Sequence, residues 1–391
     1  MPDGSDALVI KVIPSLTEVS AEAWNACVGD DHPFTSYGFL RALEDSGSAT
    51  ADTGWVPQHL IIEDPAGGLL AAAPLYLKNH SYGEYIFDWG WADAYERAGG
   101  QYYPKLQCAV PFTPATGARF LVRPDLPTQQ QHDLRQHLAA GMIRLAVQLK
   151  VSSVHITFST ETEWAELGNM GMLQRTGQQF HWENRGYETF DDFLGDLNSR
   201  KRKAIRKERK AVADKNLTIE ALSGSDITER HWDAFFRFYL ATTDKKWGQS
   251  YLTRDFFSLL GENLGDQVVL ISVEDNGQLV AAALNLSGNG TLYGRNWGCD
   301  EVHKFLHFEA CYYQAIDYAI RHGLKRVEAG AQGPHKIQRG YLPSKTYSAH
   351  WIADPGLRDA IKDFLVQERR GVEYEISELM KQSPFRNPDS P

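Results

Sequence analysis

Residues 69–77 read LLAAAPLYL and residues 279–287 read LVAAALNLS, so one apolar strand pattern occurs twice at a constant offset of 210 residues. An apolar run and a Gly-containing turn precede each copy, at 59–68 and 268–278. The turn EDNGQ is typical of a β-hairpin, because Asn and Gly tolerate a positive φ. The sequence therefore predicts two related hairpins, one in each half of the chain.

The elements around each hairpin recur in the same order. A helical stretch comes first, and a third strand, a helix and a further strand follow the hairpin. In the second half we expect these elements at 228–264, 291–298, 305–322 and 324–331, and in the first half at 34–47, 128–149 and 152–158. One matching hairpin could arise by chance, but a matching order of elements favours a duplicated unit.

Length and composition limit the number of domains and the class of protein. A chain of 391 residues with 42% hydrophobic residues is too long for one core, so we expect two domains, at 1–190 and 191–391. The net charge of −10 argues against a general nucleic-acid binder, and we expect no DNA partner. The four cysteines form no C-x-x-C pair, and the N-terminus does not resemble a signal peptide. A cytoplasmic protein is expected, with possible peripheral contact with the membrane.

This order of elements resembles the GNAT acyltransferase fold, and two such units in one chain resemble the FemA/FemB/FemX aminoacyltransferases. More closely, the sequence resembles the FemAB-like family, described as peptidoglycan biosynthesis/recognition. The resemblance is carried by HPFTSYGFLRALEDSGS (32–48), VPFTPATGARFLV (110–122), FHWENRGYETFDDFLGDLNSRKRKAIRKERK (180–210), KKWGQSYLTRDFF (245–257) and LHFEACYYQAIDYAIRHGLKRVEAGAQGPHKIQRGY (306–341).

The resemblance implies an α+β fold of two tandem GNAT-like units, each a mixed sheet flanked by helices. It also implies N-acyl or aminoacyl transfer to an amine. Our first expectation is an acyl-CoA donor and an amine acceptor such as a sphingoid base, because some proteins of this type resemble bacterial ceramide synthases. The alternatives are aminoacyl transfer from tRNA to a peptidoglycan precursor, acetylation of a small amine, and a non-catalytic recognition module. Acyl-CoA would act as a co-substrate, with no permanently bound cofactor.

One segment departs from the family pattern. Members that use acetyl-CoA carry Arg/Gln-x-x-Gly-x-Gly/Ala before the central helix, where main-chain N–H groups hold a pyrophosphate. Here residues 298–310 read GCDEVHKFLHFEA and lack that pattern. The phosphates of a donor would therefore need cations from elsewhere in the chain.

The run SRKRKAIRKERK at 199–210 contains eight Lys or Arg residues in twelve and is expected to be helical. It is either a solvated linker helix or a contact for phosphates of coenzyme A, of tRNA or of anionic lipid. A nuclear localisation signal has a similar composition, but the family resemblance is bacterial. The donor-binding residues that we expect here are Arg200, Lys201, Arg202, Lys203 and Arg206.

Candidate catalytic residues gather in two segments of the second half, 294–309 and 327–341. In a GNAT-like sheet these segments lie side by side, where the fourth and fifth strands separate. We expect His307 and Glu309 to handle protons, because amide formation must remove a proton from the amine. The other expected catalytic residues are Glu328 and His335, and the expected substrate- or donor-binding residues are Arg295, Gln332, Lys336, Arg339 and Tyr341.

Plainer interpretations stay open for each of these residues. His307 could cap the helix, Glu309 is favoured electrostatically near any helix start, and Glu328 would need a partner or a raised pKa. His303 and His307 lack a third metal ligand at a sensible spacing, so no metal site is expected. Cys299 is more typical of a small buried side chain than of a nucleophile. In the first half, the aromatic segment 99–117 either lines an acceptor groove or packs as ordinary strand and loop.

Overall fold

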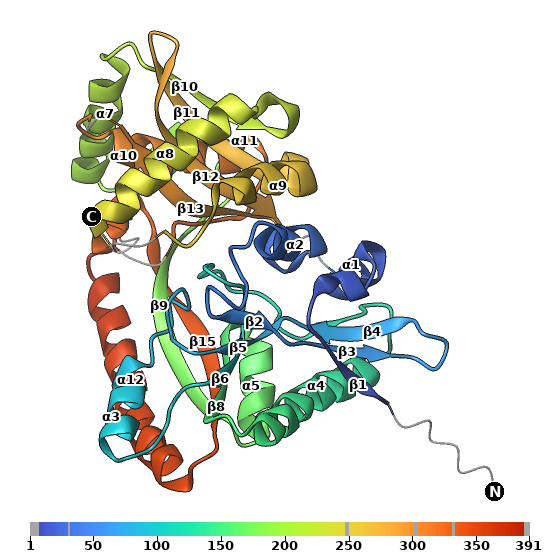
Figure 1. Ribbon diagram of the computed structural model, residues 1–391. Coiled ribbons are helices and arrows are strands. Elements are labelled where there is room, and N and C mark those ends of the chain that lie inside the picture. The colour runs from blue at the N-terminus through green and yellow to red at the C-terminus, as the bar shows by residue number, and fades with distance from the viewer. Residues whose placement is uncertain (1–7, 30–31, 247–249, 301–302, 331–332, 387–391) are drawn as a thin grey trace, which may run out of the picture. The chain divides into compact units, whose positions relative to one another are not determined.

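The computed structural model (Figure 1) describes residues 8–29, 32–246, 250–300, 303–330 and 333–386, except for the side chains of 243–246 and 334. Helices and mixed sheets alternate along the chain, so the predicted α+β class is confirmed. Among the described residues, no helix combines the length and the apolar character needed to cross a membrane.

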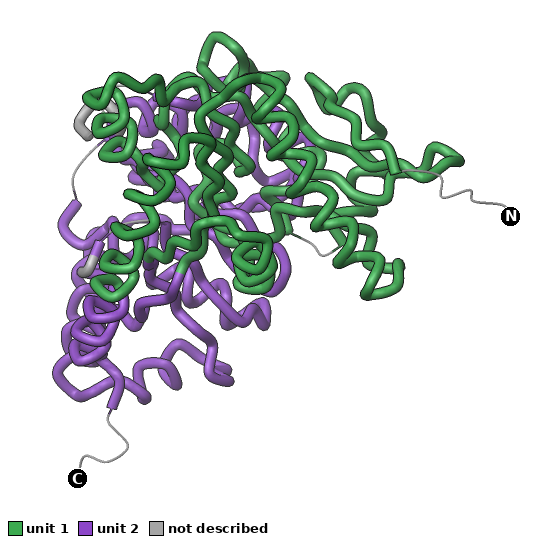
Figure 2. Tube along the Cα trace, turned by 90° about the horizontal axis from the view of Figure 1, so that it is seen from below, with its two compact units in different colours: residues 1–177, 346–372 green, residues 178–345, 373–391 purple. Residues whose placement is uncertain are grey.

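The chain forms two compact units (Figure 2). Unit 1 comprises residues 1–177 and 346–372, and unit 2 comprises residues 178–345 and 373–391. The chain passes between them within β9 (Leu173–Glu183), β15 (Leu342–Ile352) and α12 (Pro355–Met380). The return of β15 to unit 1 had no local signal in the sequence, because it depends on antiparallel pairing with β8 (Ser153–Ser159), far away in the chain.

Unit 1 contains a four-stranded sheet in the order β1 (Ile10–Ile13), β3 (His59–Glu63), β4 (Leu69–Ala73), β7 (Leu121–Val122). Its other strands run in the order β2 (Trp55–Pro57), β5 (Leu75–Lys78), β6 (Lys105–Cys108), and β6 pairs in parallel with β8. The helices are α1 (Ala21–Val28), α2 (Tyr37–Asp45), α3 (Trp89–Arg97), α4 (Thr128–Leu149) and α5 (Glu161–Asn169).

The first predicted hairpin is present as the pair β3–β4, with one change. The stretch 69–77 is two strands in different sheets, because Pro74 interrupts it and cannot donate to a ladder. The predicted helix 128–149 is α4, and its apolar side packs with β3, β4 and β8 in the core of unit 1.

Unit 2 contains strands in the order β10 (Thr218–Ser223), β11 (Val268–Asp275), β12 (Gln278–Gly288), β13 (Thr291–Cys299), β14 (Arg326–Glu328), followed by the second part of β9. Its helices include α6 (Phe190–Asp196), α7 (Ser199–Ala213), α8 (Glu229–Lys246) and α9 (Arg254–Leu264), and α8 crosses β12 and β13 (Figure 1). The predicted hairpin β11–β12, the third strand β13 and the basic helix α7 are confirmed.

The predicted helix 305–322 is irregular. It consists of α10 (Leu306–Phe308), a π-helical turn η5 (Glu309–Tyr313) and α11 (Gln314–Arg321), and it starts after Phe305, whose φ is 70°. A π-helical turn changes which side chains face the sheet and often marks a functional site. The predicted strand 324–331 is shorter than expected: β14 ends at Glu328, and Gly330 has a φ of 72°.

The strand pairing places the ends of β13 and β14 at one location. These strands pair in parallel over three residue pairs only, the last being Tyr293 with Glu328. Strand β13 continues to Cys299 against β12, with a bulge that leaves Arg295 without an opposite residue. The two strands therefore part beyond Tyr293, as the fold analogy predicted.

Substitution of Gly298 tests the close packing of α8 against β13. A Cβ at this position would lie 2.5 Å from main-chain atoms of Phe238 on α8. We expect Gly298→Ala to lower the free energy of unfolding of unit 2 by about 1–3 kcal/mol, because backbone must move to relieve the overlap. Gly371→Ala on α12 is the control, since nothing lies within 4 Å of its Cβ position and the change favours the helix. Equal stability of both variants in urea unfolding would contradict this packing.

Candidate functional site

The candidate site of unit 2 lies where β13 and β14 separate. The main chains are close at this point, because a Cβ on Gly294 would lie 3.3 Å from the Glu328 carbonyl oxygen. Beyond it, β13 carries the bulge at Arg295, and the chain after β14 turns at Gly330 toward the 3₁₀ helix η6 (Pro334–Arg339). Segments 294–299 and 329–341 therefore start from neighbouring positions, as predicted.

Five side chains gather beside this opening, and we call them the ring cluster: Trp297, His307, Phe308, Tyr312 and His335. The His307 ring lies 5.5 Å from that of Trp297, 5.4 Å from that of Tyr312 and 6.3 Å from that of His335, between centroids. The Tyr312 hydroxyl and the His335 Nε2 are 2.9 Å apart, within hydrogen-bond distance. Two of the predicted catalytic residues, His307 and His335, thus lie together.

Arg339 fixes the segment that carries His335. Its guanidinium donates to the His335 carbonyl oxygen (2.9 Å) and to the Glu208 carboxylate on α7 (3.0 Å). It also lies 3.4 Å from the centroid of the Phe308 ring. Because Arg339 is nearly buried and bonds both to the His335 carbonyl oxygen and to Glu208, it supports the ring cluster.

Lys336 is also turned into the protein. Its ammonium is buried and donates to the carbonyl oxygens of Ala329 and Gly330 (2.9 Å to the latter). Burial lowers the pKa of Lys336 to about 8. The side chain therefore holds the turn that follows β14, and a role in binding a donor phosphate stays a prediction.

Glu309 differs from His307 and His335, which lie in the ring cluster, because it contacts α7. Its Oε1 accepts from Arg209 (3.0 Å) and from Gln314 (2.8 Å). Arg209 also pairs with Asp317 at 2.9 Å. Glu309 is buried, so this pairing compensates its charge and ties α7 to the π-helical turn. Its predicted role in proton transfer stays a prediction.

Glu328 is buried at the end of β14, next to His181 of β9 in the antiparallel register. Its nearest ionisable neighbours are His181 Nε2 at 3.8 Å and Arg326 at 3.9 Å. Burial raises the pKa of Glu328 to about 8, although Arg326 acts in the opposite direction, and burial lowers the pKa of His181 to about 3. Glu328 is therefore mainly an uncharged acid at neutral pH, on the opposite face of β14 from the core residue Val327.

The other predicted site residues are spread along unit 2. Tyr341 is fully buried, and its hydroxyl donates to the Tyr312 carbonyl oxygen at 3.2 Å. It therefore supports the main chain of the ring cluster. Arg295 is half-buried at the bulge. Gln332 lies outside the described residues. The predicted cations of α7 are Arg200, Lys201, Arg202, Lys203 and Arg206, of which Arg206 pairs with Asp191 at 2.8 Å.

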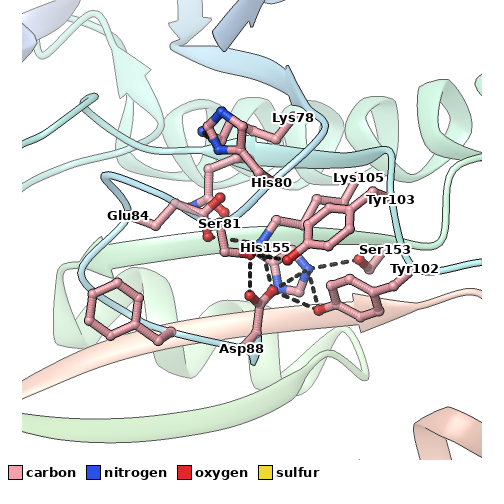
Figure 3. Close-up of polar contacts among 12 residues, drawn as sticks. Lys78, His80, Ser81, Glu84, Asp88, Tyr102, Tyr103, Lys105, Ser153 and His155 are labelled. Atoms are coloured by element: carbon pink, nitrogen blue, oxygen red, sulfur yellow. Dashed lines mark hydrogen bonds and ion pairs between the residues drawn. The ribbon is translucent and has the colours of Figure 1, made fainter. Parts of the chain in front are cut away.

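Unit 1 contains a buried charged cluster that the sequence did not reveal (Figure 3). The Lys105 ammonium donates to Ser81 Oγ (2.8 Å), Glu84 Oε2 (2.8 Å) and Asp88 Oδ2 (2.5 Å). The Tyr102 hydroxyl also donates to Asp88, at 2.6 Å. We call these five residues the Lys105 network.

Two histidines continue the Lys105 network across β8 and β15. His155 Nε2 lies 3.6 Å from Asp88 Oδ2, and His155 Nδ1 lies 2.7 Å from His350 Nδ1. Burial lowers the pKa of His155 to about 3 and raises that of Glu84 to about 7. Burial opposes the charge of Lys105, but Glu84 and Asp88 outweigh it and raise its pKa.

The Lys105 network escaped the sequence analysis for a clear reason. Its acids lie in the loop after β5 and its cation lies on β6, and no spacing rule links the two. The one available signal was that Lys105 interrupts an apolar strand pattern, which alone is common at strand ends. The cluster holds the loop 79–88 onto the sheet. Among the described residues, no group of three or more His, Cys, Asp or Glu side chains is placed to hold a metal ion.

Comparison with known proteins agrees with this architecture. The family model FemAB-like, described as peptidoglycan biosynthesis/recognition, matches residues 15–387. No curated protein sequence matches the chain. Among solved structures, FemX has a TM-score of 0.56 at 12% identity, covering 88% of this chain and 98% of that chain.

Two further structures are similar at the level of the fold. One is the C-terminal domain of a protein named as a lysylphosphatidylglycerol synthetase from Agrobacterium fabrum, with a TM-score of 0.55 at 10% identity over 90% of this chain and 97% of that one. The other is L-PGS from Bacillus licheniformis, with a TM-score of 0.50 at 9% identity over 84% and 96%. The predicted fold of two tandem GNAT-like units is confirmed.

The Lys105 network yields a stability prediction. Lys105→Met should lower the free energy of unfolding by about 3–5 kcal/mol, because it leaves Glu84 and Asp88 buried without their cation. Adding Glu84→Gln to this variant should restore part of the loss. Tyr103→Phe removes one hydroxyl contact to Ser81 at 2.8 Å and serves as a mild control of about 1 kcal/mol. A Lys105→Met protein as stable as the wild type would show that the network does not hold unit 1 together.

Glu328 predicts a pH-dependent stability. The folded protein keeps a proton on Glu328 up to a pKa of about 8, whereas the unfolded chain releases it near 4.5. The unfolded state therefore binds fewer protons between these values, and the wild type loses stability as pH rises from about 5 to 8. Glu328→Gln removes this loss, so its stability relative to the wild type should increase over that range by a few kcal/mol, roughly. Urea unfolding at several pH values measures it, with the exposed Glu220→Gln as control; parallel pH profiles would contradict the assignment.

Proposed function

The chain belongs to the FemAB-like family, described as peptidoglycan biosynthesis/recognition, and from this premise we propose that it is a transferase that joins an activated acyl group to an amine of a peptidoglycan precursor. The family and the GNAT-like fold support a transferase of the acyltransferase kind. For the acyl group we propose an aminoacyl group delivered by tRNA. The observation that carries the proposal is the opening between β13 and β14 with the ring cluster beside it.

The reaction places clear demands on such a site. The amine nitrogen attacks the carbonyl carbon of the donor, a C–N bond forms, and the bond from that carbon to the carrier oxygen breaks. The amine must lose a proton, and the carrier oxygen must gain one. Separated strand ends offer main-chain groups that are not used in a ladder, which suits binding of an extended donor or acceptor.

We assign proton transfer to His335. It is the exposed histidine of the ring cluster, and its Nε2 lies within hydrogen-bond distance of the Tyr312 hydroxyl. A histidine can take a proton from an ammonium and pass it on near neutral pH. The support from Arg339 on its carbonyl oxygen keeps the residue at a fixed position. Tyr312 orients the ring and so is a positioning residue.

Glu328 has a different part in this proposal. An acid that stays protonated at neutral pH can donate a hydrogen bond to a carbonyl oxygen or to an acceptor group, whereas an ionised carboxylate cannot. It lies at the end of β14, one residue before the turn that Lys336 holds. We assign it to substrate orientation within the same opening.

Unit 1 supports a division of labour between the two units. Its strands β6 and β8 also pair in parallel, and beyond this pairing the Gly117 N–H donates to the Phe158 carbonyl oxygen on β8. The buried Arg119 guanidinium donates to the carbonyl oxygens of Thr157 (2.9 Å), Gly117 (3.1 Å) and Ala115 (2.7 Å). Because this buried side chain bonds to main-chain carbonyl oxygens beyond the β6–β8 pairing, we assign the chemistry to unit 2 and a structural role to unit 1.

A second candidate keeps the reaction and changes the substrates. Trp297 and Phe308 give the ring cluster an apolar surface, which suits a long acyl chain better than it suits a charged amino acid. In that case the donor is a fatty acyl thioester such as acyl-CoA, and the acceptor is a long-chain amine such as a sphingoid base.

Substitution of His335 tests the proposal. We expect His335→Ala to reduce turnover about 100-fold or more, with a smaller loss for Tyr312→Phe, because the amine proton loses its acceptor. The measurement is mass spectrometry of amide products formed from aminoacyl-tRNA or acyl-CoA with cell-wall precursors and long-chain amines. His322→Ala is a matched control, since this exposed histidine contacts Tyr318 on α11, apart from the ring cluster.

The donor that yields product separates the two candidates. Product from acyl-CoA alone would replace the first candidate by the second. Full activity of the folded His335→Ala protein with the productive donor would remove His335 from the mechanism.

A further inference from the structure

Helix α7 has two chemically different faces. Ile205 and Val212 are buried, and Glu208 and Arg209 on the same side reach Arg339 and Glu309. The opposite side of the helix carries exposed cations at three- and four-residue spacing: Arg200, Lys203, Lys207 and Lys210. We call these four residues the α7 cation row.

The α7 cation row has no compensation within the described residues. None of the four side chains makes a hydrogen bond or an ion pair with these residues, whereas the neighbouring Arg206 pairs with Asp191. The row extends over eleven residues, and the ten rises between its ends give about 15 Å of helix. Like charges at this spacing repel one another and weaken a helix, so an external anion would stabilise it.

We propose that the α7 cation row docks unit 2 on an anionic phospholipid surface. A planar surface touches a helix only along its outermost row, and this is the arrangement that α7 presents. Each Lys or Arg near such a surface strengthens binding about fivefold. Four cations on one helix therefore strengthen binding by about 600-fold in total, without any apolar insertion.

An RNA partner fits the surroundings of α7 less well. Proteins that bind single strands combine cations with aromatic side chains that stack on bases, and α7 itself has no aromatic residue. The large apolar side chains that are most exposed in the described part of unit 2, Tyr374 and Met380, lie on α12.

The inner face of α7 links this docking to the candidate site. Glu208 pairs with Arg339, which holds the His335 carbonyl oxygen, and Arg209 pairs with Glu309 in the π-helical turn. A lipid surface on one side of α7 therefore sets the orientation of the ring cluster relative to that surface. Such an arrangement suits an acceptor or donor that is itself carried by lipid. The docking does not depend on the proposed reaction, because it is measured without turnover.

Vesicle binding by the full-length protein tests this proposal. We expect sedimentation with phosphatidylcholine vesicles that contain phosphatidylglycerol, no sedimentation with pure phosphatidylcholine, and release at high salt. Lys203/Lys207/Lys210→Gln should weaken binding about 100-fold. Lys203/Lys207/Lys210→Arg should bind like the wild type, which separates loss of charge from loss of fold.

The matched control removes the same number of exposed helical cations elsewhere. Arg144 on α4 and Lys362 and Arg370 on α12 make no ion pair with described residues. Arg144/Lys362/Arg370→Gln should bind vesicles like the wild type. Equal binding by the two Gln variants would overturn the proposal. So would loss of tRNA binding in Lys203/Lys207/Lys210→Gln with vesicle binding unchanged. Competition by inorganic phosphate at low concentration would instead point to a site for a free phosphate and would also overturn it.

Discussion

The parallel pairing of β13 with β14 ends after three residue pairs, and the candidate site of unit 2 depends on that short ladder. Had the pairing continued, main-chain groups of β13 after Tyr293 and of Ala329 and Gly330 would be used within the sheet. The structure prevents this in two ways. The bulge at Arg295 turns β13 away, and the positive φ at Gly330 turns the chain after β14 toward η6. The ring cluster takes Trp297 from β13 after the bulge and His335 from η6 after the turn at Gly330.

The same pairing in unit 1 shows what else such an opening can become. There the buried Arg119 guanidinium donates to three main-chain carbonyl oxygens. Unit 1 also places its buried charges in direct contact, as in the Lys105 network, whereas unit 2 buries Glu328 with the nearest cation, Arg326, 3.9 Å away. A buried network whose charges are paired stabilises one arrangement of its side chains. A buried acid without a close cation, such as Glu328, has a raised pKa instead. The two units thus share topology and differ in how they treat buried charge.

Sequence periodicity predicted most elements of the fold, because hairpins and amphipathic helices depend on local spacing. The repeat at 69–77 and 279–287 led to both hairpins, and the basic run led to α7. Sequence periodicity did not predict long-range contacts. No local signal indicates that β15 pairs with β8, or that Lys105 on β6 contacts acids of the loop after β5. For the site, residue type and the fold analogy placed His307 and His335 together. Residue type and the fold analogy did not show that the side chains of Lys336 and Arg339 are buried. Their partners, such as Gly330 and Glu208, come close only in the tertiary structure.

The position of α7 follows from a competition that sequence alone leaves undecided. Eight cations in twelve residues could all have faced solvent, yet the helix buries Ile205 and turns Glu208 and Arg209 toward the site. Burial of Arg209 is tolerable because Glu309 and Asp317 both compensate it, and burial of Glu309 is tolerable for the same reason. Each charge on the inner face is thus paired with one near the ring cluster. Within the described part of the chain, the four side chains of the α7 cation row have no such partner, so the placement of α7 concentrates uncompensated charge on its outer face.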